Sequence, residues 1–152
     1  MSDGQEPTAV EVREAAVRLL ARREHSAEEL GLKLTRRGWP DRLVWDVVGE
    51  LADAGLQSDR RVAEAFARQR AERCYGPRRI DAELRQRGID RSLIVEAIDA
   101  LDVDFAESAE QFYRRRYPDD SDSLSYPERA KRAQALARRG FGPEHFRHLV
   151  DD

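Results

Sequence analysis

The apolar positions of this chain recur with the spacing of amphipathic α-helices. In residues 9–23, for example, Val12, Ala16 and Leu19 fall on one helical face between charged positions. No run alternates apolar and polar residues for long enough to indicate a strand. The pattern therefore predicts an all-α fold, with helices over about 9–23, 27–38, 40–55, 59–74, 77–88, 90–101, 103–116 and 126–139, and a last one from Pro143.

A short motif at the end of a helix occurs three times, with glycines 50 and 52 residues apart. Each copy has leucine, then arginine and glycine, then a bulky apolar residue: Leu34…Arg37-Gly38-Trp39, Leu84…Arg87-Gly88-Ile89 and Leu136…Arg139-Gly140-Phe141. The glycine tolerates the left-handed conformation that ends a helix, and the apolar residue packs back onto that helix. A period near 50 residues indicates an array of similar units.

We therefore predict three tandem three-helix repeats in an elongated, curved array. The expected repeats are residues 9–56, 57–101 and 102–152. Residues 1–8 are polar and are expected to form a disordered tail. Residues 117–125 are acidic and rich in turn formers, which predicts a mobile linker inside the third repeat.

Composition favours thin helical layers over one large core. Charged residues make up 38% of the chain and aromatic residues only 7%, whereas about a quarter of an average protein is charged. Such a chain buries little apolar surface per residue. Helical arrays usually offer an extended surface to a large partner, and not a closed pocket to a small one.

Charge sign is distributed unevenly along the chain. The net charge is −3 overall, made up of −3 in residues 1–56, +2 in residues 57–101 and −2 in residues 102–152. Only two of the 27 basic residues are lysines, and arginine grips phosphates and carboxylates through two parallel hydrogen bonds. The middle repeat is thus where we expect an anionic surface to dock, although exposed charge is often only a solvated face.

The string Tyr75-Gly76-Pro77-Arg78-Arg79 is the most distinctive local sequence. Its structural interpretation is a tight corner between two helices. Its functional interpretation adds two arginines at a helix start, where free N–H groups already favour anions. Tyr75 could serve as a stacking platform or simply as a rim residue. The candidate binding residues for a partner or DNA are Arg68, Arg70, Arg73, Tyr75, Arg78, Arg79, Arg85 and Arg87.

Catalytic and metal chemistry find little support. His145 and His148 are three apart on a helix, but no third ligand in the sequence completes a zinc set. Cys74 has no histidine nearby in sequence and is expected to be a small buried side chain. No glycine-rich phosphate loop is present. We therefore expect no enzymatic activity, metal or cofactor. The single cysteine suits a reducing cytoplasm, and no apolar run approaches the ~20 residues of a membrane span.

An ordered series of motifs resembles the RecX regulators of the RecA recombinase. The resemblance spans roughly residues 12–150, is strongest in the first two repeats, and departs from the family in the 117–125 linker. The stretches that carry it are Ala21–Leu30, Lys33-Leu34…Gly38, Leu51–Leu56, Asp59–Ala63, Tyr75–Ile80, Leu84…Gly88-Ile89 and Arg138–Phe141.

The resemblance implies a non-enzymatic protein of three three-helix repeats that binds in the groove of the RecA nucleoprotein filament, and we expect it to be a monomer. Suppressed ATP hydrolysis, strand exchange and repressor co-cleavage by RecA would follow. DNA would be contacted directly or through the filament. The alternative is a general nucleic-acid-binding protein that acts without RecA. Steep salt dependence of binding to bare DNA would favour that alternative, which the acidic outer repeats oppose.

Overall fold

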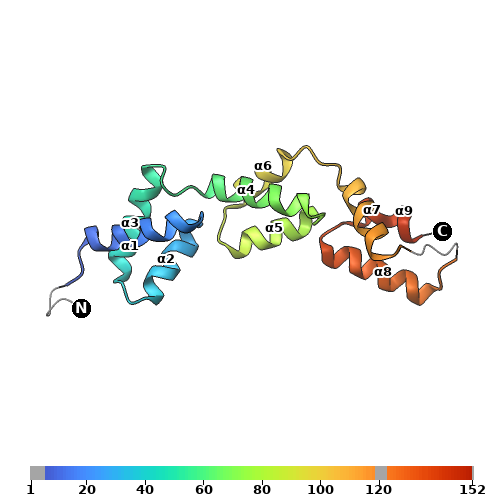
Figure 1. The fold of residues 1–152 in the computed structure, drawn as a ribbon, viewed down its shortest axis with the longest axis horizontal. Helices are drawn as coiled ribbons and strands as arrows, with labels where there is room; N and C mark the ends of the chain where they lie inside the picture. Colours follow the sequence, from blue (N-terminus) through green and yellow to red (C-terminus); the bar gives the residue numbers. More distant parts are fainter. Residues whose placement is uncertain (1–5, 119–122, 152) are drawn as a thin grey trace.

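The computed structural model describes residues 6–118 and 123–151, and within these ranges the chain forms helices and no strand (Figure 1). The prediction of an all-α fold is confirmed. The expectations for residues 1–5 and 119–122 concern positions outside the described residues. The helices are α1 (Ala9–Arg22), α2 (Ala27–Arg36), α3 (Asp41–Asp53), α4 (Asp59–Glu72), α5 (Pro77–Gln86), α6 (Arg91–Asp99), α7 (Phe105–Arg116), α8 (Tyr126–Arg139) and α9 (Pro143–Val150).

Local sequence accounts for most helix ends. A capping box starts α2: the Ser26 side chain accepts from the N–H of Glu29, whose carboxylate accepts from the N–H of Ser26. Thr8, which the sequence assigned to the tail, is the N-cap of α1. Helix α4 ends at Glu72, two residues before the predicted end at Cys74, because Cys74 itself adopts the left-handed conformation at φ 59°.

The helices pack in three groups, α1–α3, α4–α6 and α7–α9, each around its own apolar core. The half-buried Phe105 packs against both the second and the third core, whereas the first core shares no such residue with the second. We call the groups repeats 1, 2 and 3. The fully buried side chains at their centres include Leu30, Leu34, Val44 and Leu51 in repeat 1, Ile80, Leu84 and Ile94 in repeat 2, and Leu136 and Phe141 in repeat 3.

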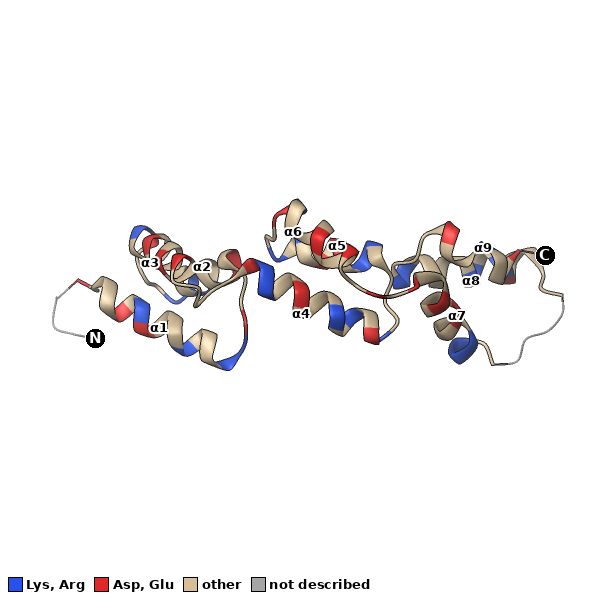
Figure 2. Ribbon diagram, turned by 90° about the horizontal axis from the view of Figure 1, so that it is seen from above, with Lys and Arg blue, Asp and Glu red and all other residues tan. Residues whose placement is uncertain are grey.

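The repeats lie end to end in an elongated molecule, with repeat 1 at one end and repeat 3 at the other (Figure 1). The middle helices α2, α5 and α8 follow one another along one side of the array. Seen from above, the first helices α1, α4 and α7 lie along another side, and both charge signs are spread over the ribbon (Figure 2). None of the described helices has the length and apolar character needed to cross a membrane.

Candidate partner-binding surface

Tyr75 lies at the centre of a group of arginines between repeats 2 and 3. The guanidinium carbons of Arg139, Arg79 and Arg70 lie 3.6, 4.7 and 5.5 Å from the centre of its ring. Cations over an aromatic face are attracted by its electron density. The ring of Tyr75 is therefore already engaged by the protein's own cations, which argues against a free stacking platform for bases.

Glu83 neutralises two of the same arginines. Its carboxylate lies 2.9 Å from Nε of Arg70 and 3.5 Å from Nε of Arg79. Arg70 and Arg87 also lie over the ring of Phe66, at 4.6 and 4.4 Å from its centre. Three of the predicted binding residues, Arg70, Arg79 and Arg87, thus make contacts within the protein itself.

The remaining predicted arginines point more freely into solvent. The side chain of Arg85 is 62% exposed and pairs with Asp81 at 2.8 Å, and that of Arg78 is 64% exposed and lies 3.9 Å from Glu144. Exposed ion pairs of this kind contribute at most about 1 kcal/mol, so a partner can displace them at small cost. Arg68 and Arg73 are exposed as well. The structure therefore divides the predicted arginines into four exposed ones and three, Arg70, Arg79 and Arg87, that stack on Tyr75 or Phe66.

The start of α5 is a contact between repeats. The N–H of Gly76 donates to the carbonyl of Arg139, and the N–H of Arg78 donates to the carbonyl of Gly140, both at 3.0 Å. A side chain at position 76 would overlap the Gly140 carbonyl group. The expectation that free N–H groups here would attract an anion is wrong for these two groups, because repeat 3 already satisfies them.

Arg139 also contributes to this contact between repeats 2 and 3, which we call a joint. The sequence analysis did not predict Arg139 as a binding residue. Its Nε donates to the carbonyl of Cys74 at 3.0 Å, its other nitrogen Nη2 reaches the carbonyl of Arg73, and its guanidinium also lies over Phe112. Its position in the repeat could have indicated this role, since Arg139 is equivalent to Arg87, which is among the predicted binding residues.

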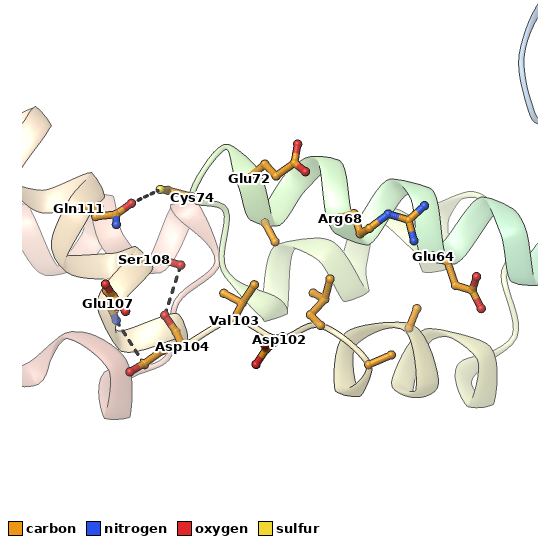
Figure 3. Close-up of a pocket in the computed structure, with 14 residues that line it drawn as sticks. Glu64, Arg68, Glu72, Cys74, Asp102, Val103, Asp104, Glu107, Ser108 and Gln111 are labelled. Atoms are coloured by element: carbon orange, nitrogen blue, oxygen red, sulfur yellow. Dashed lines mark hydrogen bonds between the residues drawn. The ribbon is translucent and has the colours of Figure 1, made fainter.

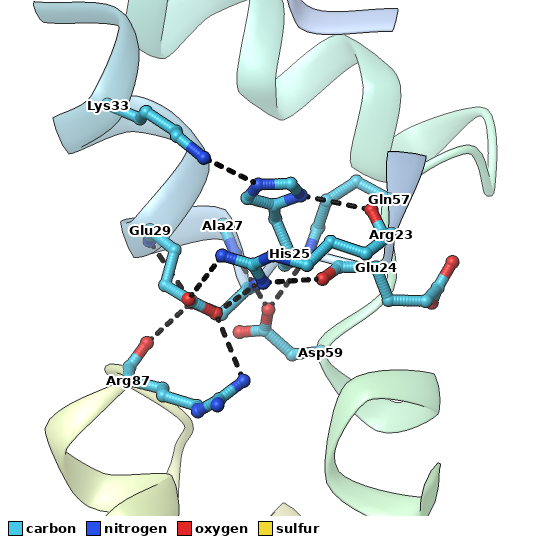
Figure 4. A network of polar contacts seen from close by, with 10 residues as sticks. Arg23, Glu24, His25, Ala27, Glu29, Lys33, Gln57, Asp59 and Arg87 are labelled. Carbon is cyan, nitrogen blue, oxygen red and sulfur yellow. Dashed lines mark hydrogen bonds and ion pairs between the residues drawn. The ribbon is translucent and has the colours of Figure 1, made fainter. Parts of the chain in front are cut away.

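A second joint of the same kind links repeats 1 and 2 (Figure 4). The hydroxyl of Ser26, the N-cap of α2, donates to the carbonyl of Arg87 at 2.5 Å. The guanidinium of Arg87 lies 3.8 Å from the carboxylate of Glu29. In both joints, the first residues of a middle helix thus meet the arginine that ends the next middle helix.

His25 lies beside this joint and is only 2% exposed. Its carbonyl accepts from Gln57, its Nδ1 lies 3.0 Å from the carbonyl of Arg23, and its Nε2 lies 3.5 Å from Nζ of Lys33 (Figure 4). Burial lowers the pKa of His25 below its ordinary value, because the charged imidazolium would lose its hydration there. The ring is therefore mainly neutral at pH 7, and its contacts are those of a buried structural residue beside the joint.

A cleft of about 730 Å³ opens between repeats 2 and 3, where α4 faces the start of α7 (Figure 3). Its lining carries five carboxylates, Glu64, Glu72, Asp102, Asp104 and Glu107, but only one basic side chain, Arg68. Asp104 is committed to capping α7, since its carboxylate accepts from the N–H of Ala106 at 3.0 Å. The acidic lining disfavours a phosphate ligand.

The side chains considered for catalysis, Cys74 and His145, make the contacts of structural residues. Cys74 is buried, as predicted, with its thiol 3.4 Å from the Gln111 amide oxygen. The ring of His145 accepts from the N–H of Gly142 at 3.2 Å and tilts against Phe105. Over the described parts of the chain, no three histidine, cysteine or acidic side chains are grouped so that they could hold a metal ion.

Three family models cover almost the whole array. They are described as the first, second and third three-helix domains of RecX, and they match residues 13–51, 58–98 and 102–150. The chain belongs to the RecX family. The resemblance drawn from the motif series is thereby confirmed, and so is the prediction of three three-helix units.

Relatives of known sequence agree with this family over most of their length. The chain is 42% identical over 147 residues to the regulatory protein RecX of Pseudomonas entomophila, covering 94% of this chain and 92% of the relative. It is 44% identical over 140 residues to the regulatory protein RecX of Halorhodospira halophila, covering 90% and 84%. RecX relatives with these names are regulatory proteins, which agrees with a role outside catalysis.

Solved RecX structures share the fold. The crystal structure of RecX from Lactobacillus salivarius superimposes with a TM-score of 0.77 at 22% identity, covering 93% of this chain and 94% of that one. A second crystal structure of regulatory protein RecX gives a TM-score of 0.75, also at 22% identity, and covers 100% of this chain and 82% of that one. The arrangement of the helices is therefore that of solved family members.

Proposed function

We propose that this chain is a non-enzymatic regulator of RecA that binds along the groove of the RecA–DNA filament. Bound there, it suppresses ATP hydrolysis, strand exchange and co-cleavage of the repressor. The observation that carries the proposal is the match of all three repeats to RecX, a family of regulatory proteins. Its partner and its inhibitory action come from the family resemblance.

The shape supports a long partner. Each repeat has its own core, and the three repeats follow one another along an extended molecule (Figure 2). Arrays of this kind bind through surfaces that run over several repeats. A protein filament with DNA inside offers both carboxylates and phosphates over such a length.

The surface of repeat 2 argues against binding to bare DNA as the main activity. Affinity for DNA comes largely from basic side chains that replace counterions on the phosphates. Here Arg70, Arg79 and Arg87 are paired with Glu83 or Glu29, and the neighbouring cleft is acidic. Much of the basic charge of repeat 2 is thus paired with the protein's own carboxylates, which favours a protein partner.

Co-sedimentation with RecA filaments assembled on single-stranded DNA tests the proposal directly. We expect the chain to pellet with the filaments, to pellet weakly with the DNA alone, and to lower DNA-dependent ATP hydrolysis by RecA. Unchanged hydrolysis and strand exchange at saturating protein would reject the proposal. Tight, steeply salt-dependent binding to DNA without RecA would support the general nucleic-acid-binding alternative.

Charge reversal at Arg78 tests the exposed part of the predicted surface. Arg78→Glu should weaken filament binding while leaving helicity intact, because its guanidinium is exposed and lies 3.9 Å from Glu144, which is a long ion pair. Arg79→Glu is less informative, since Arg79 stacks on Tyr75 within the joint. The matched control is Lys131→Glu, which makes the same change of charge at an exposed position on α8. Equal losses of filament affinity in both variants would show that the net charge of the protein, and not the position of Arg78, determines binding.

A further inference from the structure

The three glycine corners have the same hydrogen bonds. The N–H of each apolar residue donates five positions back, Trp39 to Leu34 at 3.3 Å, Ile89 to Leu84 at 3.1 Å and Phe141 to Leu136 at 3.1 Å. Each glycine N–H also donates to the residue three positions back, at 3.0 Å, and each glycine has positive φ. This is the Schellman arrangement that ends a helix and turns its last carbonyls outward. The corners of repeats 1, 2 and 3 are thus equivalent.

Two of these corners are covered by the start of a helix. The corner of repeat 2 receives Ser26, whose hydroxyl donates to the Arg87 carbonyl, and Glu29, whose carboxylate faces the Arg87 guanidinium. The corner of repeat 3 receives Gly76, whose N–H donates to the Arg139 carbonyl. A side chain on the corner glycine would collide in either case, with Glu28 at Gly88 and with Arg79 at Gly140. The corner is therefore a surface that this fold uses to hold a helix start.

The corner of repeat 1 is not covered by any of the described residues. Apart from the chain neighbours of Gly38, none of their heavy atoms lies within 4 Å of the position that a Cβ on Gly38 would occupy, and Arg36 and Arg37 are exposed. Lys33 stands one turn earlier on α2, so the negative end of this helix is ringed by cations. The surface has the shape of the two internal corners and a stronger positive charge.

The other end of the array does not fit this corner. The helix starts that fill the internal corners, Ser26 and Gly76, stand 11 residues before the arginines of their own repeats, Arg37 and Arg87. In repeat 3 the equivalent position is Glu128, which lies inside α8, because that helix begins at Tyr126. A second copy therefore offers no matching helix start in its last repeat, and head-to-tail stacking of copies is disfavoured.

We infer that the Arg37–Gly38 corner docks the start of an α-helix on the partner protein, one with an acidic side chain in its first turn. The N-cap of that helix would donate to the Arg37 carbonyl, as Ser26 and Gly76 do to Arg87 and Arg139. Its carboxylate would meet the Arg37 guanidinium, as Glu29 meets Arg87. The inference rests on the proposed function for its partner, which it takes to be a RecA protomer of the filament.

Charge reversal at the corner tests this contact. Arg37→Glu should weaken binding to RecA filaments about tenfold, as expected when a charge-assisted hydrogen bond is replaced by repulsion. Arg18→Glu, at an exposed position of α1 in the same repeat, is the matched control and should change the affinity less than about twofold. Circular dichroism and thermal melting check that both variants fold. Wild-type affinity in a folded Arg37→Glu variant would overturn the inference.

A photo-crosslinking amino acid at position 36 identifies the occupant. With RecA filaments as the probe, we expect the cross-link to fall within the first two turns of a RecA helix that carries aspartate or glutamate. A cross-link to DNA, to a second copy of this chain, or to another part of RecA would overturn the inference, and so would the absence of any cross-link while binding persists. If the wild-type chain fails to bind filaments at all, the proposed function itself fails.

Discussion

Gly76→Ala is predicted to weaken the docking of repeat 3 on repeat 2 without unfolding either. The backbone of Gly76, at φ −82° and ψ 165°, is one that alanine adopts freely, so the substitution brings no local strain. The added methyl group, however, would overlap the main-chain carbonyl of Gly140, which cannot rotate away as a flexible side chain could. The effect therefore falls on the joint alone.

Two main-chain hydrogen bonds set the magnitude of this effect. Separation of the repeats breaks the bond from Gly76 to Arg139 and the bond from Arg78 to Gly140. At about 1 kcal/mol net for each bond, docking weakens by about 2 kcal/mol, which changes the ratio of docked to undocked molecules roughly thirtyfold. Repeat 3 keeps its own core around Leu136 and Phe141, so the far-ultraviolet circular dichroism should be unchanged.

Amide hydrogen exchange measures this directly. The first N–H groups of a helix have no partner within the helix, so protection at Gly76 and Arg78 reports docking. We expect faster exchange at these two amides in Gly76→Ala, with unchanged protection at Ile80, and a larger radius of gyration in small-angle scattering. Gly49→Ala is the control, since nothing lies within 4 Å of its added methyl group. Unchanged exchange at Gly76 and Arg78 would refute the reasoning.

Three further predictions concern buried or stacked groups. Arg139→Gln should loosen the same joint by about 1–2 kcal/mol, since it removes the cation over Tyr75, and exchange at the Gly76 amide measures it. Tyr113→Phe should lower the free energy of unfolding by about 1–3 kcal/mol in urea titrations, because the buried Arg132 loses the hydroxyl that accepts its Nη1–H at 2.8 Å. A stability equal to wild type would contradict this. The pKa of His25 is lowered by burial, so its contribution to stability is present above the ordinary histidine pKa and lost as pH falls below it. Thermal melting should therefore show a decline between about pH 7 and pH 5 that is smaller in His25→Gln.

The corners were predictable because they are local. The glycine at 38, 88 or 140, the arginine before it and the apolar residue after it all act within one turn of chain. The capping box of Ser26 and Glu29 is likewise written in four consecutive residues. Sequence spacing therefore predicted the helices, their ends and the repeat.

The joints were not predictable in the same way. Gly76 looks like a simple helix start, and its role appears only when Gly140, 64 residues away in the chain, is placed against it. The arginines around Tyr75 looked like a binding patch because sequence shows charge but not the carboxylate of Glu83 between them. The pair Arg79–Glu83 has the (i, i+4) spacing of a helical ion pair, but the pair Arg70–Glu83 joins two helices of repeat 2, which local spacing does not show.

The two joints also differ in what holds them, and this has a mechanical consequence. Between repeats 2 and 3, main-chain bonds and the shared ring of Phe105 resist bending. Between repeats 1 and 2, the contacts are polar side chains, including the exposed pair Arg61–Glu24 and the pair Arg87–Glu29. Dissolved ions screen such pairs over about 8–10 Å at physiological strength. We therefore expect repeats 2 and 3 to move as a stiff rod and repeat 1 as a more compliant arm, and a higher salt concentration should soften that arm while leaving the rod unchanged.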